Sequence, residues 1–280
     1  VYNIAHAVRV AGRIDETALD QCIGELLRRH PALRSTFADV EGLPEVRLAP
    51  PRSYGNLERI HEKAPEAEIV EVLDREQRKR FDLERGPLAR FLFAETMQNE
   101  TILCFSCHHI VSDGWSMMVA LQELSELYNA KVAGRSPELK EIDTDYFDLA
   151  YRENEATRSG EFDESIRRWR ELLADAPRKL TLPYDKVMPG RRSWSGDKVY
   201  FEIPEAMGSL VKAFAASRNA TEFMAFLAVF NVLLRVLSGQ DDMVVGTVAA
   251  NRLSLEHERV IGFMVNPLPI RGKVSSSDTF

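Results

Sequence analysis

The residues of this 280-residue chain best suited to chemistry are two adjacent histidines followed by an Asp-Gly pair. The segment, residues 108–116, reads His-His-Ile-Val-Ser-Asp-Gly-Trp-Ser. An apolar run before it predicts a buried strand, and the residues after it predict a helix. In α/β proteins, reactive groups gather where strands end and helices begin. A histidine there can act as a general base near neutral pH, and Asp113 can orient the imidazole or fix the loop.

Two other roles for the histidine pair stay open on the residues alone. The pair can bind a metal, although no third ligand is close in the sequence, or both imidazoles can be structural. Cys104 and Cys107 form a Cys-x-x-Cys pair within an apolar run, and no second Cys or His pair follows at zinc spacing. Because three cysteines in so long a chain make no disulfide framework, we interpret these two as small buried apolar residues in a reducing compartment.

The composition is that of an ordinary globular protein, with 45% hydrophobic and 28% charged residues. A net charge of −7 argues against nucleic-acid binding, which needs a basic face. The most apolar run, residues 223–237, is interrupted by Asn231 and Arg235, and the chain opens without a signal peptide, so we expect a cytoplasmic protein with no membrane partner. The chain starts without Met and stops in a polar stretch, so we expect a piece of a longer protein.

Alternating strand and helix patterns predict an α/β fold. The composition changes at residues 177–195, which are rich in Pro and Gly. This change predicts a linker between an N-terminal lobe, 1–176, and a partial C-terminal lobe, 196–280. The run 101–108 is apolar on both faces, which predicts a central strand. The other expected strands are 5–10, a short one near 46–48, 88–97, 198–203 and 243–248. The expected helices are 15–30, 66–80, 114–128, 145–155, 162–174, 204–218 and 221–237.

The histidine segment resembles the signature of the condensation domains of nonribosomal peptide synthetases, His-His-x-x-x-Asp-Gly. The shorter pattern His-x-x-x-Asp-Gly is shared with chloramphenicol acetyltransferase and names only that superfamily. Further segments resemble other condensation-domain motifs in the right order and spacing, and together they span nearly the whole chain: 29–37 (RHPALRSTF), 81–90 (FDLERGPLAR), 146–150 (YFDLA), 240–246 with 250–252 (QDDMVVG and ANR), and 261–271 (IGFMVNPLPIR).

Some features depart from the family pattern. The first motif and the last two are expected outside residues 1–280, so the resemblance implies a chain truncated at both ends with an incomplete second lobe. Pro267 stands where a polar residue is expected. The histidine motif is intact, which disfavours heterocyclization, epimerization and degenerate recruitment domains.

The resemblance implies two chloramphenicol-acetyltransferase-like lobes arranged in a V, with the active site in a tunnel between them. It implies an amide-bond-forming acyltransferase that joins substrates held as phosphopantetheine thioesters on upstream and downstream carrier proteins, beside an adenylation domain. No bound cofactor or metal is expected, because the thioester already carries the free energy.

The resemblance also implies roles for single residues. His109 is the expected catalytic residue, as a base for the acceptor amine or as a group that positions it. His108 is expected to be structural. Asp113 is expected to pair with Arg252 in a buried ion pair between the territories of the two lobes. The remaining expectations are an oxyanion-binding N–H on Gly114, support of the loop by Trp115 and Ser116, and a weaker site candidate, Asn266.

Two alternatives stay open beside the condensation reaction. One is an acyltransferase of the same fold that uses free coenzyme A. The other is a module that docks carrier proteins without catalysis. For this chain we expect little condensation activity. Because the helix at 221–237 is apolar nearly all round, we expect either self-association through the second lobe or a longer chain that covers this helix.

Overall fold

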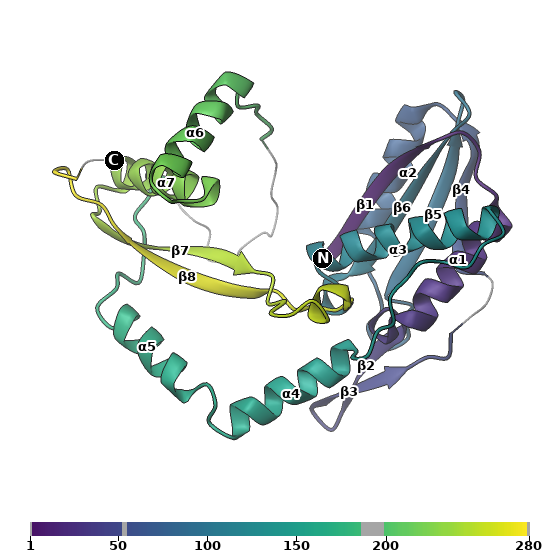
Figure 1. Ribbon diagram of the computed structural model, residues 1–280, viewed down its shortest axis with the longest axis horizontal. Coiled ribbons are helices and arrows are strands. Elements are labelled where there is room, and N and C mark those ends of the chain that lie inside the picture. The colour runs from purple at the N-terminus through teal and green to yellow at the C-terminus, as the bar shows by residue number, and fades with distance from the viewer. Residues whose placement is uncertain (1, 52–54, 186–198, 279–280) are drawn as a thin grey trace. The chain divides into compact units, whose positions relative to one another are not determined.

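The computed structural model of the chain describes residues 2–51, 55–185 and 199–278 (Figure 1). Contacts divide the chain into two compact units. The first contains residues 1–161 and Ala249–Asn266, and the second contains Phe162–Val248 and Pro267–Phe280. Compared with the lobes proposed from the sequence, residues 162–176 pack with the second unit and Ala249–Asn266 packs with the first. Residues 186–195 of the proposed linker lie outside the described residues.

A four-stranded sheet is the framework of the first unit. Its order is β1 (Asn3–Ala11), β6 (Glu100–His108), β5 (Ala89–Thr96) and β4 (Leu57–Ala64). Strand β6 is antiparallel to both β1 and β5, whereas β4 runs parallel to β5. Strand β6 is buried from Thr101 to Cys107, so the prediction of a central strand is confirmed.

Helices cover both faces of this sheet (Figure 1). Helices α1 (Glu16–Arg29) and α3 (Gly114–Val132) pack against each other and share one core cluster, whereas α2 (Glu66–Arg78) joins a smaller cluster with β4. Asp15 caps α1 as predicted, with its carboxylate accepting the N–H of Ala18 at 2.9 Å. These elements hold β6 and α3 rigidly on either side of the histidine segment.

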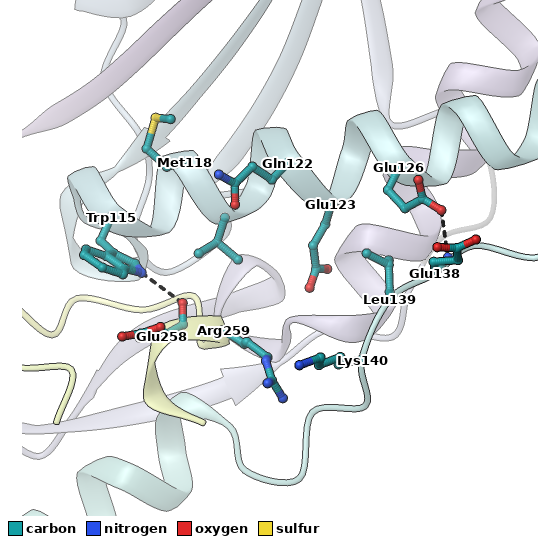
Figure 2. A pocket seen from close by; sticks show the side chains of 11 residues that line it. Trp115, Met118, Gln122, Glu123, Glu126, Glu138, Leu139, Lys140, Glu258 and Arg259 are labelled. Atoms are coloured by element: carbon teal, nitrogen blue, oxygen red, sulfur yellow. Dashed lines mark hydrogen bonds between the residues drawn. The ribbon is translucent and has the colours of Figure 1, made fainter. Parts of the chain in front are cut away.

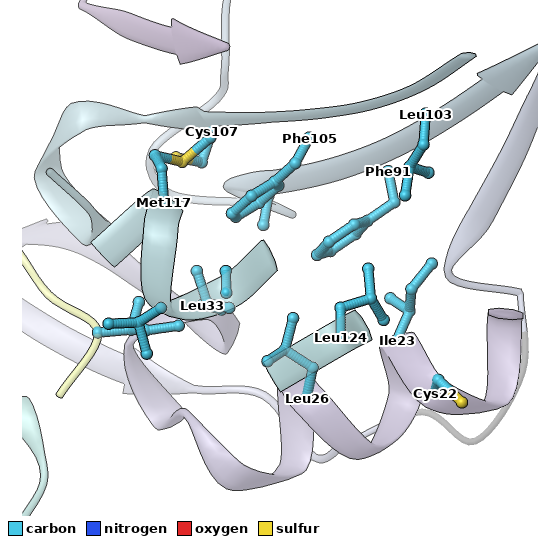
Figure 3. Packing of buried hydrophobic residues seen from close by; sticks show 14 of the residues in the cluster. Cys22, Ile23, Leu26, Leu33, Phe91, Leu103, Phe105, Cys107, Met117 and Leu124 are labelled. Atoms are coloured by element: carbon cyan, nitrogen blue, oxygen red, sulfur yellow. The ribbon is translucent and has the colours of Figure 1, made fainter. Parts of the chain in front are cut away.

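The main core lies between the sheet and α1 with α3 (Figure 3). The rings of Phe91 and Phe105 on adjacent strands stack with centroids 4.5 Å apart. The Cys107 thiol lies 3.7 Å from the Met117 sulfur, which joins the end of β6 to the start of α3. The residues that bear the site are therefore fixed to the main core of the unit.

All three cysteines are buried and free of disulfides. Side chains alternate across a strand, so Cys104 and Cys107, three residues apart on β6, lie on opposite faces of the sheet and cannot share a ligand. Burial raises the pKa of the Cys104 thiol to about 11 and that of Cys107 to about 12, and it also raises the pKa of Cys22. The interpretation of the Cys-x-x-Cys pair as buried core residues is confirmed.

The described part of the first unit also contains a hairpin, a further helix and short 3₁₀ turns. The hairpin is antiparallel, with β2 and β3 as its strands. Helix α4 begins with a capping box in which Asp145 and Asp148 satisfy each other's backbone N–H groups. The bounds are β2 (Ser35–Val40), β3 (Leu43–Leu48), α4 (Tyr146–Arg158), η1 (Pro31–Arg34), η2 (His109–Val111) and η3 (His257–Arg259).

The second unit combines helices with a two-stranded sheet. Its elements are α5 (Asp163–Leu173), α6 (Glu205–Ser217), α7 (Glu222–Ser238), β7 (Asp242–Ala249) and β8 (Asn266–Lys273). The Arg271 guanidinium joins the sheet to the end of α5, because it donates to the Asp242 carboxylate, the Asp175 carboxylate and the Leu172 carbonyl. Gly239 ends α7 in the left-handed conformation, as its position predicts.

The predicted strand at 198–203 is wrong for its described residues. Residues 199–203 form no strand, and Val199, Tyr200 and Phe201 are 89%, 85% and 80% exposed. An alternating apolar pattern becomes a strand only when a neighbouring strand satisfies its backbone groups, and among the described residues none pairs with this segment.

No single helix in the described part of the chain has both the length and the apolar character to cross a membrane. Helices α6 and α7 meet the length and composition test only as a pair, and they are bent by 103° relative to each other.

Candidate active site

The histidine loop connects the central strand β6 to helix α3. His108 ends β6 opposite Asn3 of β1, His109 begins η2, and Gly114 begins α3. The backbone N–H of His109 donates to the carbonyl of Tyr2 at 2.7 Å, so the residue before the edge strand β1 also holds the loop. The sequence prediction of a strand, a tight loop and a helix around the two histidines is confirmed.

The ring of His109 is fixed in one tautomer. Its Nδ1 lies 2.8 Å from the carbonyl oxygen of Ser112, which can only accept a hydrogen bond, so Nδ1 carries the proton. In the neutral ring, Nε2 then keeps a free lone pair and can accept a proton or a hydrogen bond. The ring of Phe263 packs edge-on against the imidazole at 4.8 Å between centroids. The half-buried His109 thus has the hydrogen bonding that a general base or a positioning acceptor needs.

His108 has the opposite arrangement. Its Nδ1 accepts the N–H of Ile110 at 3.1 Å, and its ring meets the edge of Phe81 at 6.3 Å between centroids. The face of Phe81 in turn carries the guanidinium of Arg90 at 3.8 Å. Burial lowers the pKa of His108, and the neighbouring His109 adds to the effect, so its ring is neutral near pH 7. The side chain of His108 thus contacts Ile110 and Phe81 within the first unit, which agrees with a structural role.

Asp113 is the most heavily bonded residue of the loop. Its side chain is fully buried and accepts a bidentate pair of hydrogen bonds from Arg252, at 2.9 and 3.0 Å. It also caps α3 by accepting the N–H of Ser116 at 2.9 Å, and it accepts the N–H of Met264 at 3.0 Å. One carboxylate therefore joins the start of α3 to two points of the segment 249–266.

The hydroxyl of Ser116 extends this network. It lies 2.8 Å from the Asp113 carboxylate and 2.9 Å from the carbonyl of Gly262, and it accepts hydrogen bonds from the N–H of Gly262 and from Arg252. Burial works to raise the pKa of Asp113, but the hydrogen bonds from Arg252 and Ser116 outweigh it, and the pKa lies below its ordinary value. Asp113 is therefore an ionised carboxylate that faces away from solvent.

The predicted ion pair between Asp113 and Arg252 is thus present, with both side chains at most 1% exposed. Its partners were expected in different lobes, whereas both lie in the first compact unit of the structure. Ala249–Asn266 packs with the first unit, so Arg252 and Asp113 lie in the same compact body. The physical reason is the network itself, because its buried hydrogen bonds require the segment around Arg252 to lie against α3.

Three further predicted site residues make fewer contacts with the rest of the protein than Asp113 and Ser116 do. Trp115 is 42% exposed, its Nε1–H donates to the Glu258 carbonyl at 2.9 Å, and its ring lies under the Arg252 guanidinium at 5.6 Å. A Cβ on Gly114 would meet nothing within 4 Å, so neither packing nor backbone conformation of the described residues demands this glycine. Asn266 is exposed at the start of β8, and among the described residues its side chain makes no hydrogen bond to the histidine loop.

A family model described as the condensation domain matches residues 1–280. The chain is a condensation domain. The family assignment rests on the whole length and agrees with the order of motifs read from the sequence.

Relatives at the level of sequence are much longer proteins. The chain is 36% identical over 280 residues to malpinin synthetase of Mortierella alpina, covering 99% of the chain and 4% of that protein. It is 34% identical over 285 residues to a linear gramicidin synthase of Brevibacillus parabrevis, covering 100% of the chain and 6% of that protein. The chain therefore spans only a small share of the curated relatives it matches.

Solved structures support the same fold. The X-domain from teicoplanin biosynthesis matches with a TM-score of 0.86 and 25% sequence identity, covering 99% of this chain and 62% of that one. The mixed α/β architecture is that of solved condensation domains.

The structure of this condensation domain adds contacts that the sequence did not predict. A Cβ on Gly262 would lie 2.3 Å from the ring of Tyr146, so the glycine allows the start of α4 to pack directly on the segment that holds Met264 and Phe263. Two of the motifs that resemble those of the family are thus in contact. A glycine inside an apolar run is the signal for this in the sequence, and it does not name the partner.

The Arg-His motif at the end of α1 has a buried acidic partner on α3. Glu123 accepts two hydrogen bonds from Arg29, at 2.9 and 3.0 Å, and lies 2.9 Å from Nε2 of His30. Burial works to raise the pKa of Glu123, but His30 and Arg29 outweigh it and lower the pKa to about 2. Arg34 donates to the carbonyls of Leu27 and Ala49, so this motif joins α1, α3 and the end of β3.

Proposed function

We propose that this condensation domain forms a peptide bond between two substrates held as phosphopantetheine thioesters on carrier proteins. The observation that carries the proposal is the fixed tautomer of His109, whose Nδ1 bonds to the Ser112 carbonyl and leaves Nε2 free as an acceptor. Family membership supplies the class of reaction, acyl transfer.

In the proposed reaction, the α-amine of the acceptor attacks the thioester carbon of the donor. The C–N bond forms, the C–S bond breaks, and the donor's pantetheine leaves as a thiol. Nε2 of His109 takes the proton that the amine loses and passes it to the leaving thiolate, and the Ser112 carbonyl stabilises the transient imidazolium through Nδ1–H. In this proposal, the N–H of Gly114, at the positive end of α3, donates to the developing oxyanion.

His109 can accelerate this reaction in two ways. As a base it removes the amine proton, which contributes about 10²–10⁴-fold. As a positioning group it holds the amine in line with the carbonyl, which contributes several kcal/mol without proton transfer. His109→Asn separates the two roles, because asparagine keeps a hydrogen-bonding side chain and loses the basic nitrogen.

The proposal includes the partners and the setting of the reaction. The donor and acceptor arrive on upstream and downstream carrier proteins, and an adenylation domain of the same synthetase loads them in the cytoplasm. The thioester supplies the free energy, so the reaction needs no further bound cofactor. Within the described residues, no group of three or more His, Cys, Asp and Glu side chains gathers in a way that suits a metal ion.

The test is amide formation, with two loaded carrier proteins, by a complete condensation domain that includes this chain. His109→Ala should lower the rate by at least about 100-fold, whereas the exposed histidine of β1 changed in the same way, His6→Ala, should leave it unaltered. Equal rates for the wild-type chain and His109→Ala would remove His109 from the reaction.

A second candidate is a docking module without catalysis. The observation that favours it is a solved complex of the X-domain with OxyB from teicoplanin biosynthesis, which matches this chain with a TM-score of 0.83 and 25% identity. Turnover with two loaded carriers would exclude this role. A preference for soluble acyl-coenzyme A over carrier-bound thioesters would instead indicate an ordinary acyltransferase.

A further inference from the structure

A pocket of about 690 Å³ runs along the exposed side of α3, beginning beside the histidine loop (Figure 2). Trp115 lines the end near the loop, and Glu126 and Glu138 line the far end. From Trp115 to Glu123 the helix advances eight residues, which is about 12 Å at 1.5 Å per residue. All residues of this pocket belong to the first unit.

Two cations face each other across this pocket. Figure 2 shows the side chains of Lys140 and Arg259 extending toward one another below Glu123. Among the residues that the structure describes, neither side chain has a hydrogen-bond or ion-pair partner. The guanidinium of Arg29 lies beside them, because it donates to the carbonyl of Lys140 at 3.0 Å, but its charge is already paired with Glu123.

Four carboxylates line the pocket, and each has another partner or lies away from the two cations. Glu123 is bonded to Arg29 and His30, and Glu126 accepts two hydrogen bonds from Arg135. In Figure 2, Glu138 lies beside Glu126 and away from Lys140, and the Glu258 side chain points away from Arg259. Two like charges that face each other repel, and an anion between them relieves the repulsion. A guanidinium and an ammonium are the groups that proteins use to bind phosphate.

The rest of the lining suits a long, mostly apolar arm attached to that anion. Trp115, Met118 and Leu139 supply apolar surface, and Gln122 supplies an amide donor and acceptor between the loop end and the cationic part. An arm that carries a phosphate at one end and amides along its length matches this order of groups.

We propose that Lys140 and Arg259 bind the phosphate of a phosphopantetheine arm whose other end lies at the histidine loop beside Trp115. The inference rests on the proposed function, because that function brings such an arm to this domain. It adds a binding role for two residues outside the histidine motif.

Binding of small probes to the chain tests the inference directly. Titration calorimetry should show 4′-phosphopantetheine binding at least about tenfold more tightly than pantetheine, which lacks the phosphate. The double variant Lys140→Ala/Arg259→Ala should bind the two probes equally. Lys131→Ala, which removes an exposed lysine of helix α3 that does not line the pocket, should behave as the wild type.

Three results would overturn the inference. They are equal binding of the two probes to the wild-type chain, a preference for phosphopantetheine that survives in the double variant, and inorganic phosphate binding as tightly as phosphopantetheine. The last result would indicate a general phosphate site with no selectivity for the arm.

Turnover separates this inference from the proposed function. With N-acetylcysteamine thioesters, which lack the phosphate, the double variant should match the wild type, whereas with phosphopantetheinyl thioesters its KM should rise about tenfold or more. If the double variant forms amide from both kinds of thioester with the KM of the wild type, the result would contradict the phosphate site and leave the proposed function intact. Phosphate-dependent binding without any amide formation by a complete domain that includes this chain would contradict the proposed function alone.

Discussion

The Asp113 carboxylate has two structural roles that are usually held by separate residues. It caps helix α3 and neutralises a buried arginine that lies 139 residues further along the chain. Because its oxygens face Arg252, Ser116 and Met264, they are turned toward the protein interior and are not available as a base. Asp113 therefore fixes the histidine loop. The side chain of the loop that keeps a free acceptor for a substrate is His109, through Nε2.

Replacing Asp113 by alanine should lower the free energy of unfolding by about 3–5 kcal/mol, because Arg252 would stay buried without its partner. Urea unfolding measures this, with the exposed Asp143→Ala as control. The double variant Asp113→Ala/Arg252→Met should recover part of the loss, since it leaves no buried charge. A change of less than about 1 kcal/mol in Asp113→Ala would contradict the role of the pair.

Contacts between single residues could be predicted from the sequence only where both partners belong to motifs of the family. The resemblance matched Asp113 to Arg252, and the pair is present. Composition and spacing alone could not find this pair, because a contact across 139 residues leaves no local pattern. For the same reason the contact of Gly262 with Tyr146 was not foreseen.

Helices α1 and α3 are joined by one buried acid, Glu123. Arg29 and His30 lie at the end of α1, and the carboxylate that binds both lies in the middle of α3. Since both helices also cover the main core, this cluster fixes the angle at which α3 leaves the histidine loop.

Glu123→Gln should lower the free energy of unfolding near pH 7 by about 3 kcal/mol, because Arg29 and His30 lose a buried partner. In the wild type the pKa of Glu123 is depressed from 4.5 to about 2, so the folded state resists protonation. The stabilisation by this carboxylate is complete above about pH 4.5 and is lost as the pH falls toward about 2.

The stability curves of the wild type and Glu123→Gln should therefore converge as the pH falls through that window. Urea unfolding at several pH values measures the difference, and Glu71→Gln, an exposed glutamate of α2, is the matched control. A constant difference between the two curves from pH 7 down to pH 2 would show that another group carries the acid sensitivity.

Elements were predicted best where the period of apolar residues is regular. The helices α1, α2 and α3 and the strands β5 and β6 lie close to their predicted positions, because each buries one face or both in the core. Strand β4 was missed, since its sequence Leu-Glu-Arg-Ile-His-Glu-Lys-Ala is highly charged and its strand form depends on pairing with β5. The false strand at 198–203 is the converse case, an apolar pattern without a pairing partner in the described chain.

At the scale of the whole molecule, the second unit exposes large apolar side chains. On α6 and α7, Leu210 is 69% exposed and Val236 is 71% exposed, and an apolar pocket of about 500 Å³ lies between the two helices. Exposed apolar area of this kind favours association. The expected self-association of the chain stays a prediction.

Light scattering after size exclusion should show a mass above 31.8 kDa that rises with protein concentration. The double variant Leu210→Glu/Val236→Glu should shift the chain toward monomer, because it places charges on the apolar faces. Val132→Glu, at an exposed apolar position at the end of α3, is the control. A wild-type chain that stays monomeric at high concentration would show that these faces do not associate.

The burial of the three thiols has a practical consequence for following this domain in solution. A maleimide reacts with the thiolate, and the raised pKa values of Cys22, Cys104 and Cys107 together with their burial keep that form rare and out of reach. The native chain should therefore be silent to such reagents without any cysteine being removed. A single cysteine introduced on the surface, for example Glu71→Cys, would then carry a fluorophore at one defined position, and a burst of extra labelling would report unfolding of the core.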